Sequence, residues 1–239
     1  GWANERGRGT AANALRANEL YTLGCTRGSA RACAELARLA ERRDSRDPQI
    51  FELYNQACTG AYLPGCLELG RRYDTAGYRE YAFALYRTVC ALHEPEACTR
   101  LAAAEEQIPG KAADAAAHYE QGCAASSVTG CTKAGLLYAA GKGVPADAAR
   151  AARLFETGCN GNDFAACEEL ADAYSAGRGV ARDLGHALAL YDRACAAARG
   201  AACLQAGMLY RRAGRSELAQ RRFDQGCRAG NQPACFLSR

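Results

Sequence analysis

The chain has 239 residues, of which 49% are hydrophobic and 23% charged, and its formal net charge is +4. This balance excludes disorder caused by high charge and few apolar residues, and Arg and Glu mixed along the chain do not form the basic field of a nucleic-acid binder. No run of about 18 apolar residues occurs, so the sequence predicts no membrane-spanning helix. Fourteen cysteines are the unusual feature.

The first residues of the chain, 1–6, do not look like a signal peptide. We therefore interpret the sequence as a mature or trimmed form. Residues 1–9 are predicted to be an N-terminal segment that is disordered or trimmed. Residues 10–239 are predicted to form a single solenoid domain, because a repeat runs through them.

The repeat is marked by cysteines in pairs with the spacing C-x7-C. Successive first cysteines are separated by 33, 32, 33, 36, 36 and 32 residues, which is the period of stacked two-helix repeats rather than of a globular enzyme. The pairs are Cys25 and Cys33, Cys58 and Cys66, Cys90 and Cys98, Cys123 and Cys131, Cys159 and Cys167, Cys195 and Cys203, and Cys227 and Cys235.

Each repeat opens with a segment, here called helix B, that ends at the first cysteine. An aromatic residue stands four positions before that cysteine and a small or aliphatic residue eight before it. The aromatic positions are Tyr21, Tyr54, Tyr86, Tyr119, Phe155, Tyr191 and Phe223. The earlier positions are Ala17, Ile50, Ala82, Ala115, Ala151, Ala187 and Ala219. Because residues four apart share one helix face, this pattern predicts a helix with one buried stripe.

The chain cannot stay helical between paired cysteines. Eight residues of helix would place their Cα atoms about 12 Å apart, whereas a disulfide tolerates about 7 Å. Turn-forming residues in each interval, such as Pro64-Gly65 and Gly161-Asn162, agree with a break. Each pair is therefore predicted to staple the end of one helix to the start of the next.

The second cysteine opens another predicted helix, helix A. Four residues beyond it the residue is small in six repeats, which allows close approach of the two helices. These positions are Ala37, Gly70, Ala102, Gly135, Ala171 and Gly207. A loop then leads to the next helix B, and the two longest repeats carry Gly141-x-Gly143 and Gly177-x-Gly179 there, which we interpret as turn glycines.

The cysteines could serve as disulfides, as zinc ligands or as redox-active thiols. Disulfides explain the even count and constant spacing. Zinc binding would more usually show C-x2-C, and the only histidines, His93, His118 and His186, occupy unrelated positions of the repeat. Redox catalysis requires a closely spaced, exposed pair of lowered pKa, and seven equivalent pairs favour architecture instead. We predict disulfides and neither a metal site nor a cofactor.

Two segments carry a resemblance to a known family. Residues 138–144, Tyr-Ala-Ala-Gly-Lys-Gly-Val, and residues 174–180, Tyr-Ser-Ala-Gly-Arg-Gly-Val, resemble the Sel1-like repeat. The C-x7-C pairs resemble its cysteine-rich subfamily, typified by the Helicobacter cysteine-rich proteins, in which each pair bonds within a repeat. The resemblance implies an all-α, α/α superhelical solenoid of about seven disulfide-stapled, tetratricopeptide-like helix pairs, which holds partners on its concave side.

Motifs of common enzymes are missing from the sequence. It contains no S-x-x-K with a later K-T-G, no G-x-S-x-G, no H-E-x-x-H and no G-x-x-x-x-G-K-[ST]. We therefore predict no enzyme. The resemblance alone admits an alternative, a β-lactam or peptidoglycan-fragment binding protein with weak β-lactamase activity. A second alternative from the same source is a redox or cofactor-assembly scaffold like the mitochondrial relatives.

The preferred hypothesis is a noncatalytic scaffold that binds a protein or peptide on its concave face, with no nucleic acid and no prediction of oligomeric state. The disulfides predict an oxidising home, either periplasmic, cell-surface or secreted, and the Ala- and Arg-rich composition favours a bacterial source. Side chains two and five residues beyond each second cysteine are predicted to leave the core and meet the partner. They are Glu35, Arg38, Glu68, Arg71, Arg100, Lys133, Leu136, Glu169, Asp172, Gln205 and Met208.

Overall fold

The structure is a computed structural model that describes residues 4–5 and 13–238. Over these residues the chain forms fourteen helices, named α2 to α15, and no strand. The chain divides into two compact units, Gly1–Leu101 and Ala102–Arg239, and each is described by itself. Of the predicted N-terminal segment 1–9, all but residues 4 and 5 lie outside the described residues. The single solenoid domain over 10–239 stays a prediction.

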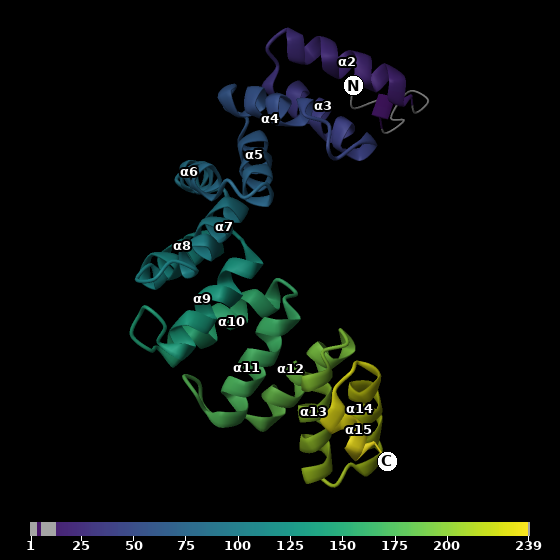
Figure 1. The fold of residues 1–239 in the computed structure, drawn as a ribbon. Helices are drawn as coiled ribbons and strands as arrows, with labels where there is room; N and C mark the ends of the chain where they lie inside the picture. The colour runs from purple at the N-terminus through teal and green to yellow at the C-terminus, as the bar shows by residue number, and fades with distance from the viewer. Residues whose placement is uncertain (1–3, 6–12, 239) are drawn as a thin grey trace. The chain divides into compact units, whose positions relative to one another are not determined.

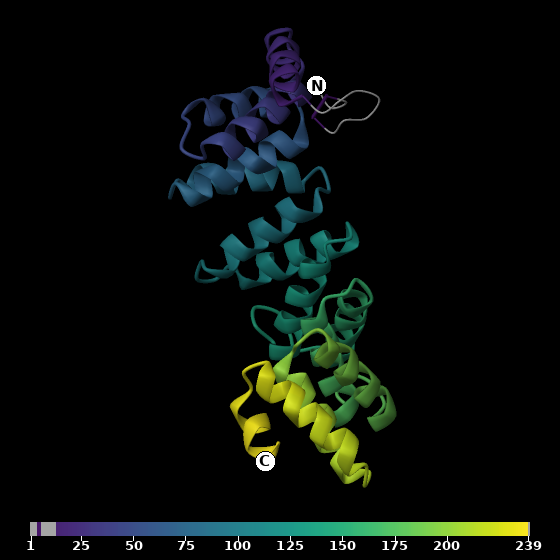
Figure 2. The same ribbon diagram turned by 90° about the vertical axis from the view of Figure 1, so that its right-hand side faces the viewer.

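The first unit contains two complete repeats, helix α6 and the start of α7, and each helix from α2 to α6 packs against the next along the chain (Figures 1 and 2). Its helices are α2 (Ala14–Thr26), α3 (Ala30–Arg43), α4 (Gln49–Thr59), α5 (Leu63–Thr75), α6 (Arg79–Cys90) and α7 (Pro95–Glu106) as far as Leu101. Helices α2, α4 and α6 are B helices, and α3, α5 and α7 are A helices.

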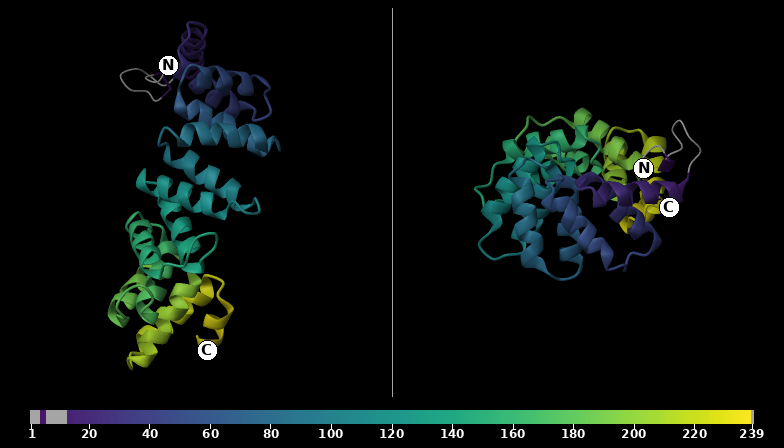
Figure 3. Two further views of the ribbon diagram at one scale, coloured as in Figure 1. Left: turned by 90° about the vertical axis from the view of Figure 1, so that its left-hand side faces the viewer. Right: turned by 90° about the horizontal axis from the view of Figure 1, so that it is seen from above.

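The second unit continues the same alternation from Ala102 onward (Figure 3). Its helices after α7 are α8 (Ala112–Ala124), α9 (Val128–Ala140), α10 (Ala148–Asn160), α11 (Phe164–Ala176), α12 (Leu184–Ala196), α13 (Gly200–Arg212), α14 (Ser216–Arg228) and α15 (Gln232–Leu237). Consecutive helices again pack against each other. The all-α, helix-pair fold class predicted from the sequence is confirmed.

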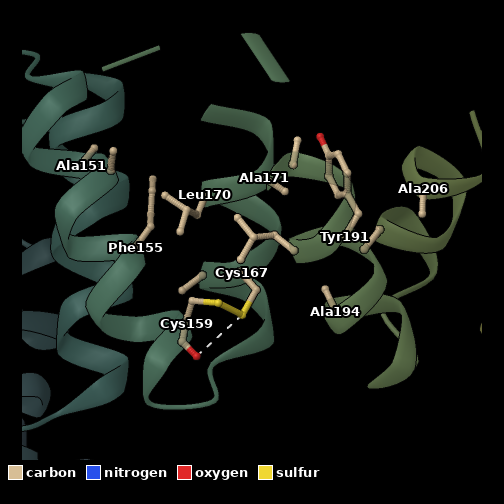
Figure 4. Close-up of a cluster of buried hydrophobic side chains, with 14 of the residues drawn as sticks. Ala151, Phe155, Cys159, Cys167, Leu170, Ala171, Tyr191, Ala194 and Ala206 are labelled. Atoms are coloured by element: carbon tan, nitrogen blue, oxygen red, sulfur yellow. Dashed lines mark hydrogen bonds between the residues drawn. A yellow bond between two sulfur atoms is a disulfide. The ribbon is translucent and has the colours of Figure 1, made fainter. Parts of the chain in front are cut away.

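The predicted B stripe forms the core of both units. All seven aromatic residues four positions before the first cysteines are only 1% to 7% exposed, and the seven small or aliphatic residues one turn earlier are at most 2% exposed. Figure 4 shows one such layer, in which Phe155 and Tyr191 lie on either side of the α11 residues Leu170 and Ala171. Burial of this stripe supplies the hydrophobic driving force for stacking each pair on the next.

Every C-x7-C pair forms a disulfide, with Cα atoms 4.4 to 4.6 Å apart. The intervening turn is the same each time. The third residue after the first cysteine has a positive φ, and the N–H of the fourth bonds the carbonyl of the residue before that cysteine, as Ser127 N does to Gly122 O at 2.8 Å. This is a Schellman ending of helix B. The fourth residue then caps helix A, and Ser29, Ser127 and Asp163 do so through their side chains.

Small residues on the A helices lie against the rings of the following B helix. A Cβ built on Gly135 would stand 2.6 Å from the Phe155 ring, and one on Gly207 would stand 2.5 Å from the Phe223 ring. The turn glycines are also explained: Gly143 and Gly179 both have positive φ, and a Cβ at Gly179 would meet the Ala148 carbonyl at 2.1 Å. Among the described helices, none is long and apolar enough to cross a bilayer.

Candidate partner-binding face on the A helices

A shallow groove of about 320 Å³ opens on the A helices of the first unit, between α3 and α5. Four residues predicted from the sequence as partner contacts, Glu35, Arg38, Glu68 and Arg71, lie on its walls. They occupy the positions two and five residues beyond Cys33 and Cys66. The other lining residues are Ala34, Glu41, Tyr54, Tyr62 and Pro64.

The four predicted residues form two ion pairs at equivalent places in successive repeats. Arg38 Nε lies 2.8 Å from Glu35, and Arg71 Nη1 lies 2.9 Å from Glu68. The Arg71 side chain is 45% exposed and that of Arg38 30% exposed. Pairs of this kind at the surface contribute at most about 1 kcal/mol to stability, so a partner can engage these side chains at little cost to the fold.

The lining residues Tyr54 and Glu41 make a second set of polar contacts at the groove. The Tyr54 hydroxyl donates to Glu41 at 3.2 Å, and the Arg72 guanidinium holds the same carboxylate at 2.5 Å. Burial raises the pKa of Tyr54 above its ordinary value, and the negative charge of Glu41 raises it further. The phenol therefore stays neutral and acts as a hydrogen-bond donor from the core to the face.

In the first repeat, the equivalent tyrosine, Tyr21, also donates its hydroxyl to a carboxylate, that of Glu5. Glu5 accepts from the Tyr21 hydroxyl at 3.1 Å and forms an ion pair with Arg38. Burial raises the pKa of Tyr21 to about 12, with the hydrogen bond to Glu5 as the next cause. Burial opposes ionisation of Glu5, but the bonds from Arg38 and Tyr21 leave the pKa of this carboxyl below its ordinary value.

The remaining predicted residues are distributed over α7 to α13 with different degrees of exposure. Arg100 bonds Glu96 on its own helix, whereas Lys133 and Leu136 are exposed on α9. The half-buried residues are Glu169, Asp172 and Met208, and Gln205 is exposed. Burial, followed by the charges of Asp172 and Glu168, raises the pKa of Glu169. Of the predicted residues, those of α3 and α5 line the groove described above.

The histidines occupy structural positions. His118 Nδ1 lies 2.6 Å from the carboxylate of Glu105, which is 3% exposed, and the His186 ring packs on Tyr174 with centroids 4.4 Å apart. His93 is the positive-φ residue of its disulfide turn. The described residues contain no group of three or more His, Cys, Asp or Glu side chains arranged to hold a metal ion.

Sequence reasoning missed the carboxylates that hold the core tyrosines. Glu41 and Glu106 each stand eight residues beyond a second cysteine and thirteen before the tyrosine they bind, Tyr54 and Tyr119. That spacing was available as a signal. The sequence contains many other acidic residues, and Glu41 and Glu106 differ from most of them only in bonding a buried tyrosine hydroxyl. That difference is visible in the structure and not in the spacing.

Solved structures with this arrangement are known. A protective antigen of uropathogenic Escherichia coli that displays an SLR fold matches at 17% identity with a TM-score of 0.55, over 92% of this chain and 58% of its own. A Sel1 repeat protein from Oxalobacter formigenes matches at 22% identity with a TM-score of 0.72, over 91% of this chain and 100% of its own. The chain has the Sel1-like repeat fold.

One further structure matches about half of the chain. Helicobacter pylori cysteine-rich protein B matches at 28% identity with a TM-score of 0.43, over 52% of this chain and 91% of its own. The chain spans 58% of the Escherichia coli antigen, which is therefore the longer protein. No protein-family model matches the chain, and no curated protein matches it in sequence. The resemblance inferred from the motifs is thus supported through structure.

Proposed function

We propose that this Sel1-like repeat protein is a noncatalytic scaffold that binds an extended segment of a partner protein along its A helices, on the concave side of the solenoid. The observation that carries the proposal is the groove between α3 and α5, whose walls bear a Glu–Arg pair at the same position of two successive repeats. A groove whose Glu–Arg pairs recur from one repeat to the next suits an extended chain rather than a compact ligand.

Oxidising surroundings are part of the proposal. Seven disulfides with no free cysteine among the described residues fit a protein that folds and works outside the reducing cytosol. The periplasm, the cell surface and the extracellular space all meet this condition. Cross-linked repeats also keep the binding surface preorganised, which lowers the entropic cost of association.

The test is affinity capture by the oxidised full chain from a native cell-envelope fraction, followed by binding measurements with the purified partner. Glu68→Arg combined with Arg71→Glu reverses the polarity of one groove pair and keeps the net charge. The matched control is Arg16→Glu with Glu19→Arg, which reverses an exposed pair on α2. We expect the groove variant to weaken binding about tenfold or more and the control to bind like the wild type.

Equal binding by the two swapped variants would show that the α3 and α5 groove is not the contact surface. Capture of no partner by the wild type would contradict the scaffold function itself. Circular dichroism of both variants establishes that each remains folded, so that a loss of binding reports on the surface.

A further inference from the structure

The tyrosines of the B helices share one hydrogen-bond arrangement. Four of the five hydroxyls at this position donate to a carboxylate of the same chain, and three of the four carboxylates also accept from a cation. The hydroxyl contacts are Tyr21 to Glu5, Tyr54 to Glu41, Tyr119 to Glu106 and Tyr191 to Asp172. The cations are Arg38 at Glu5, Arg72 at Glu41 and Lys142 at Glu106. Buried phenols ordinarily have such partners.

Tyr86 is the exception. It is 2% exposed, and its buried hydroxyl has no hydrogen-bond partner among the described residues. Asp74 stands where Glu41 and Glu106 stand in their repeats, eight residues beyond the second cysteine. Its side chain is one methylene shorter than glutamate, the following link is one residue shorter, and Asp74 is exposed. The carboxylate that completes the arrangement elsewhere therefore does not reach Tyr86.

Two arginines lie around this hydroxyl. Burial raises the pKa of Tyr86, the positive charge of Arg100 lowers it, and the charge of Asp74 raises it. A weak hydrogen-bonding approach of Arg100 and the charge of Arg71 lower the same pKa, so both guanidinium groups lie near the hydroxyl. Arg100 directs Nε and Nη2 to Glu96 at 2.9 and 2.8 Å, and its approach to the Tyr86 hydroxyl lowers the pKa of Tyr86 without reaching ordinary hydrogen-bond geometry. Its side chain is 33% exposed, and its ion pair with Glu96 is a surface pair, which is weak and easily rearranged.

An arginine in this setting can accept a second carboxylate. Arg38 occupies the same position as Arg71, five residues beyond the second cysteine, and has the same glutamate three residues earlier. It nevertheless binds Glu5 as well. Arg71 donates Nη1 to Glu68, and its Nε and Nη2 have no protein acceptor in the described part of the chain. Arg71 also lines the groove between α3 and α5, so it belongs both to the groove wall and to the surroundings of Tyr86.

We propose that Tyr86, Arg71 and Arg100 form a subsite for a glutamate side chain of the partner segment. The inference rests on the proposed function and specifies the chemistry that the face recognises. All three groups donate hydrogen bonds, and a carboxylate accepts from all of them. Glutamate is the residue that fills this role beside Tyr54 and Tyr119, and the shorter Asp74 does not fill it here. Entry requires Arg100 to turn from Glu96 toward the incoming carboxylate.

The experiment selects random dodecapeptides by phage display on the oxidised full chain. The peptides are fused through their C-termini, so no terminal carboxylate is free. A selected peptide is then synthesised with capped ends, and its Kd is measured by fluorescence polarisation with the wild type, Tyr86→Phe and Asp74→Glu. The matched control is Tyr119→Phe, whose hydroxyl already binds Glu106 within the chain.

We expect the selected peptides to share a glutamate whose replacement by glutamine weakens binding about tenfold. Tyr86→Phe should weaken the glutamate peptide and leave the glutamine peptide unchanged. Asp74→Glu should compete for the subsite from within the chain and weaken the glutamate peptide, and Tyr119→Phe should have no effect. Peptides that bind without a shared acid, or equally as glutamine variants, would overturn the subsite and leave the scaffold function standing. Selection of no peptide would count against both.

Discussion

Single hydroxyl groups distinguish the repeats of this protein. Tyr119 is 1% exposed and donates to Glu106 at 3.2 Å, whereas Tyr86 is equally buried and its hydroxyl has no partner among the described residues. A hydrogen bond to a charged group contributes about 1.5 to 3 kcal/mol, while a buried polar group without a partner costs about 1 to 3 kcal/mol. The same substitution should therefore have opposite effects at the two positions.

Tyr119→Phe is predicted to lower the free energy of unfolding by about 1.5 kcal/mol, and Tyr86→Phe to leave it unchanged or raise it by up to about 1 kcal/mol. Urea unfolding of the oxidised proteins measures both. The ring stays in place in each variant, so packing is preserved and the hydroxyl alone is tested. A loss at Tyr86 as large as that at Tyr119 would mean that the Tyr86 hydroxyl has a stabilising partner in solution.

Glu106 connects the core tyrosine to solvent-facing charge. The Lys142 bond at 2.8 Å is the largest cause lowering the pKa of Glu106, and it outweighs burial, which acts to raise that pKa. A carboxyl whose folded pKa is depressed stabilises the fold above its unfolded pKa, near 4.5, and loses this contribution as the pH falls through the folded value.

Lys142→Met is therefore predicted to lower the free energy of unfolding by about 0.5 kcal/mol at pH 7, a small effect because Lys142 is more than half exposed. The difference from the wild type should shrink as the pH falls below 4.5. Unfolding curves at pH 7 and pH 3 provide the comparison. A difference that is constant across this range would assign the effect to packing of the lysine side chain instead of to the ion pair.

Among the elements, the helices were predictable from the sequence and the turns only in part. An aromatic residue such as Tyr54 and a small residue such as Ala17 recur four and eight positions before the first cysteines, so periodicity alone identified the buried stripe. The spacing of the paired cysteines required a break in the helix. The residue that makes the break was not predictable. It is the third after the first cysteine, with positive φ, and in five repeats it is not glycine, as with Ala61 and Ala198. Tertiary packing and the disulfide override local preference there.

The candidate face was predictable to a similar degree. Helical spacing identified Glu35, Arg38, Glu68 and Arg71 as residues beside the core stripe, and the structure places them on one groove. Spacing gave no reason for the second unit to differ, yet Met208 packs against the core cluster there and Asp172 binds Tyr191. Contacts with the neighbouring helix decide which residues beside the core stripe remain available to a partner. The sequence of a single repeat does not contain this information.

Replacing a strained turn residue by glycine tests the turn. Ala198 is exposed and has a φ of 61°, in the left-handed region. Ala198→Gly is predicted to raise the free energy of unfolding by about 0.5 to 1 kcal/mol. The reason is that relief of the left-handed strain exceeds the entropy that glycine adds to the unfolded chain. The reciprocal control is Gly230→Ala, at φ of 83° with no atom within 4 Å of the added Cβ. It should destabilise by about 1 kcal/mol. Loss of stability in both variants would show that side-chain contacts of Ala198 outweigh backbone strain.

Substitution of a glycine on an A helix tests the close packing of that helix against the ring of the following B helix. Gly135→Ala is predicted to lower the free energy of unfolding by about 1 to 3 kcal/mol, because the Cβ would stand 2.6 Å from the Phe155 ring, and overpacking exceeds the roughly 1 kcal/mol gained in helix propensity. Gly185→Ala on α12 is the control, where the added Cβ meets only the Asp183 carboxylate at 3.3 Å. Thermal unfolding distinguishes the two. A stabilised Gly135→Ala protein would mean that the ring moves aside at little cost.

For the molecule as a whole, stability in each unit comes from contacts between consecutive helices together with one disulfide in each repeat. Repeat arrays have no single large core, so local cross-links contribute a large share of their stability. Closing a loop of about nine residues is worth roughly 2.5 kcal/mol in the chain-entropy relation. Stability should therefore depend strongly on the redox state, which the hydrophobic stripe alone would not produce.

Reduction is predicted to lower the melting temperature by more than any single substitution above, because several loops are released at once. Thiol titration in guanidinium should find almost no free cysteine in the native protein before reduction and fourteen after it. Paired Cys123→Ala and Cys131→Ala substitutions should lower the free energy of unfolding by about 2 to 4 kcal/mol, which isolates one staple from the other six. A native protein rich in free thiols, with a melting temperature insensitive to reductant, would remove both the disulfide basis of its stability and the argument for an oxidising compartment. Because the B stripe would still be buried in such a protein, that result would make hydrophobic packing sufficient for the fold and leave the cysteine spacing as a marker of the repeat only.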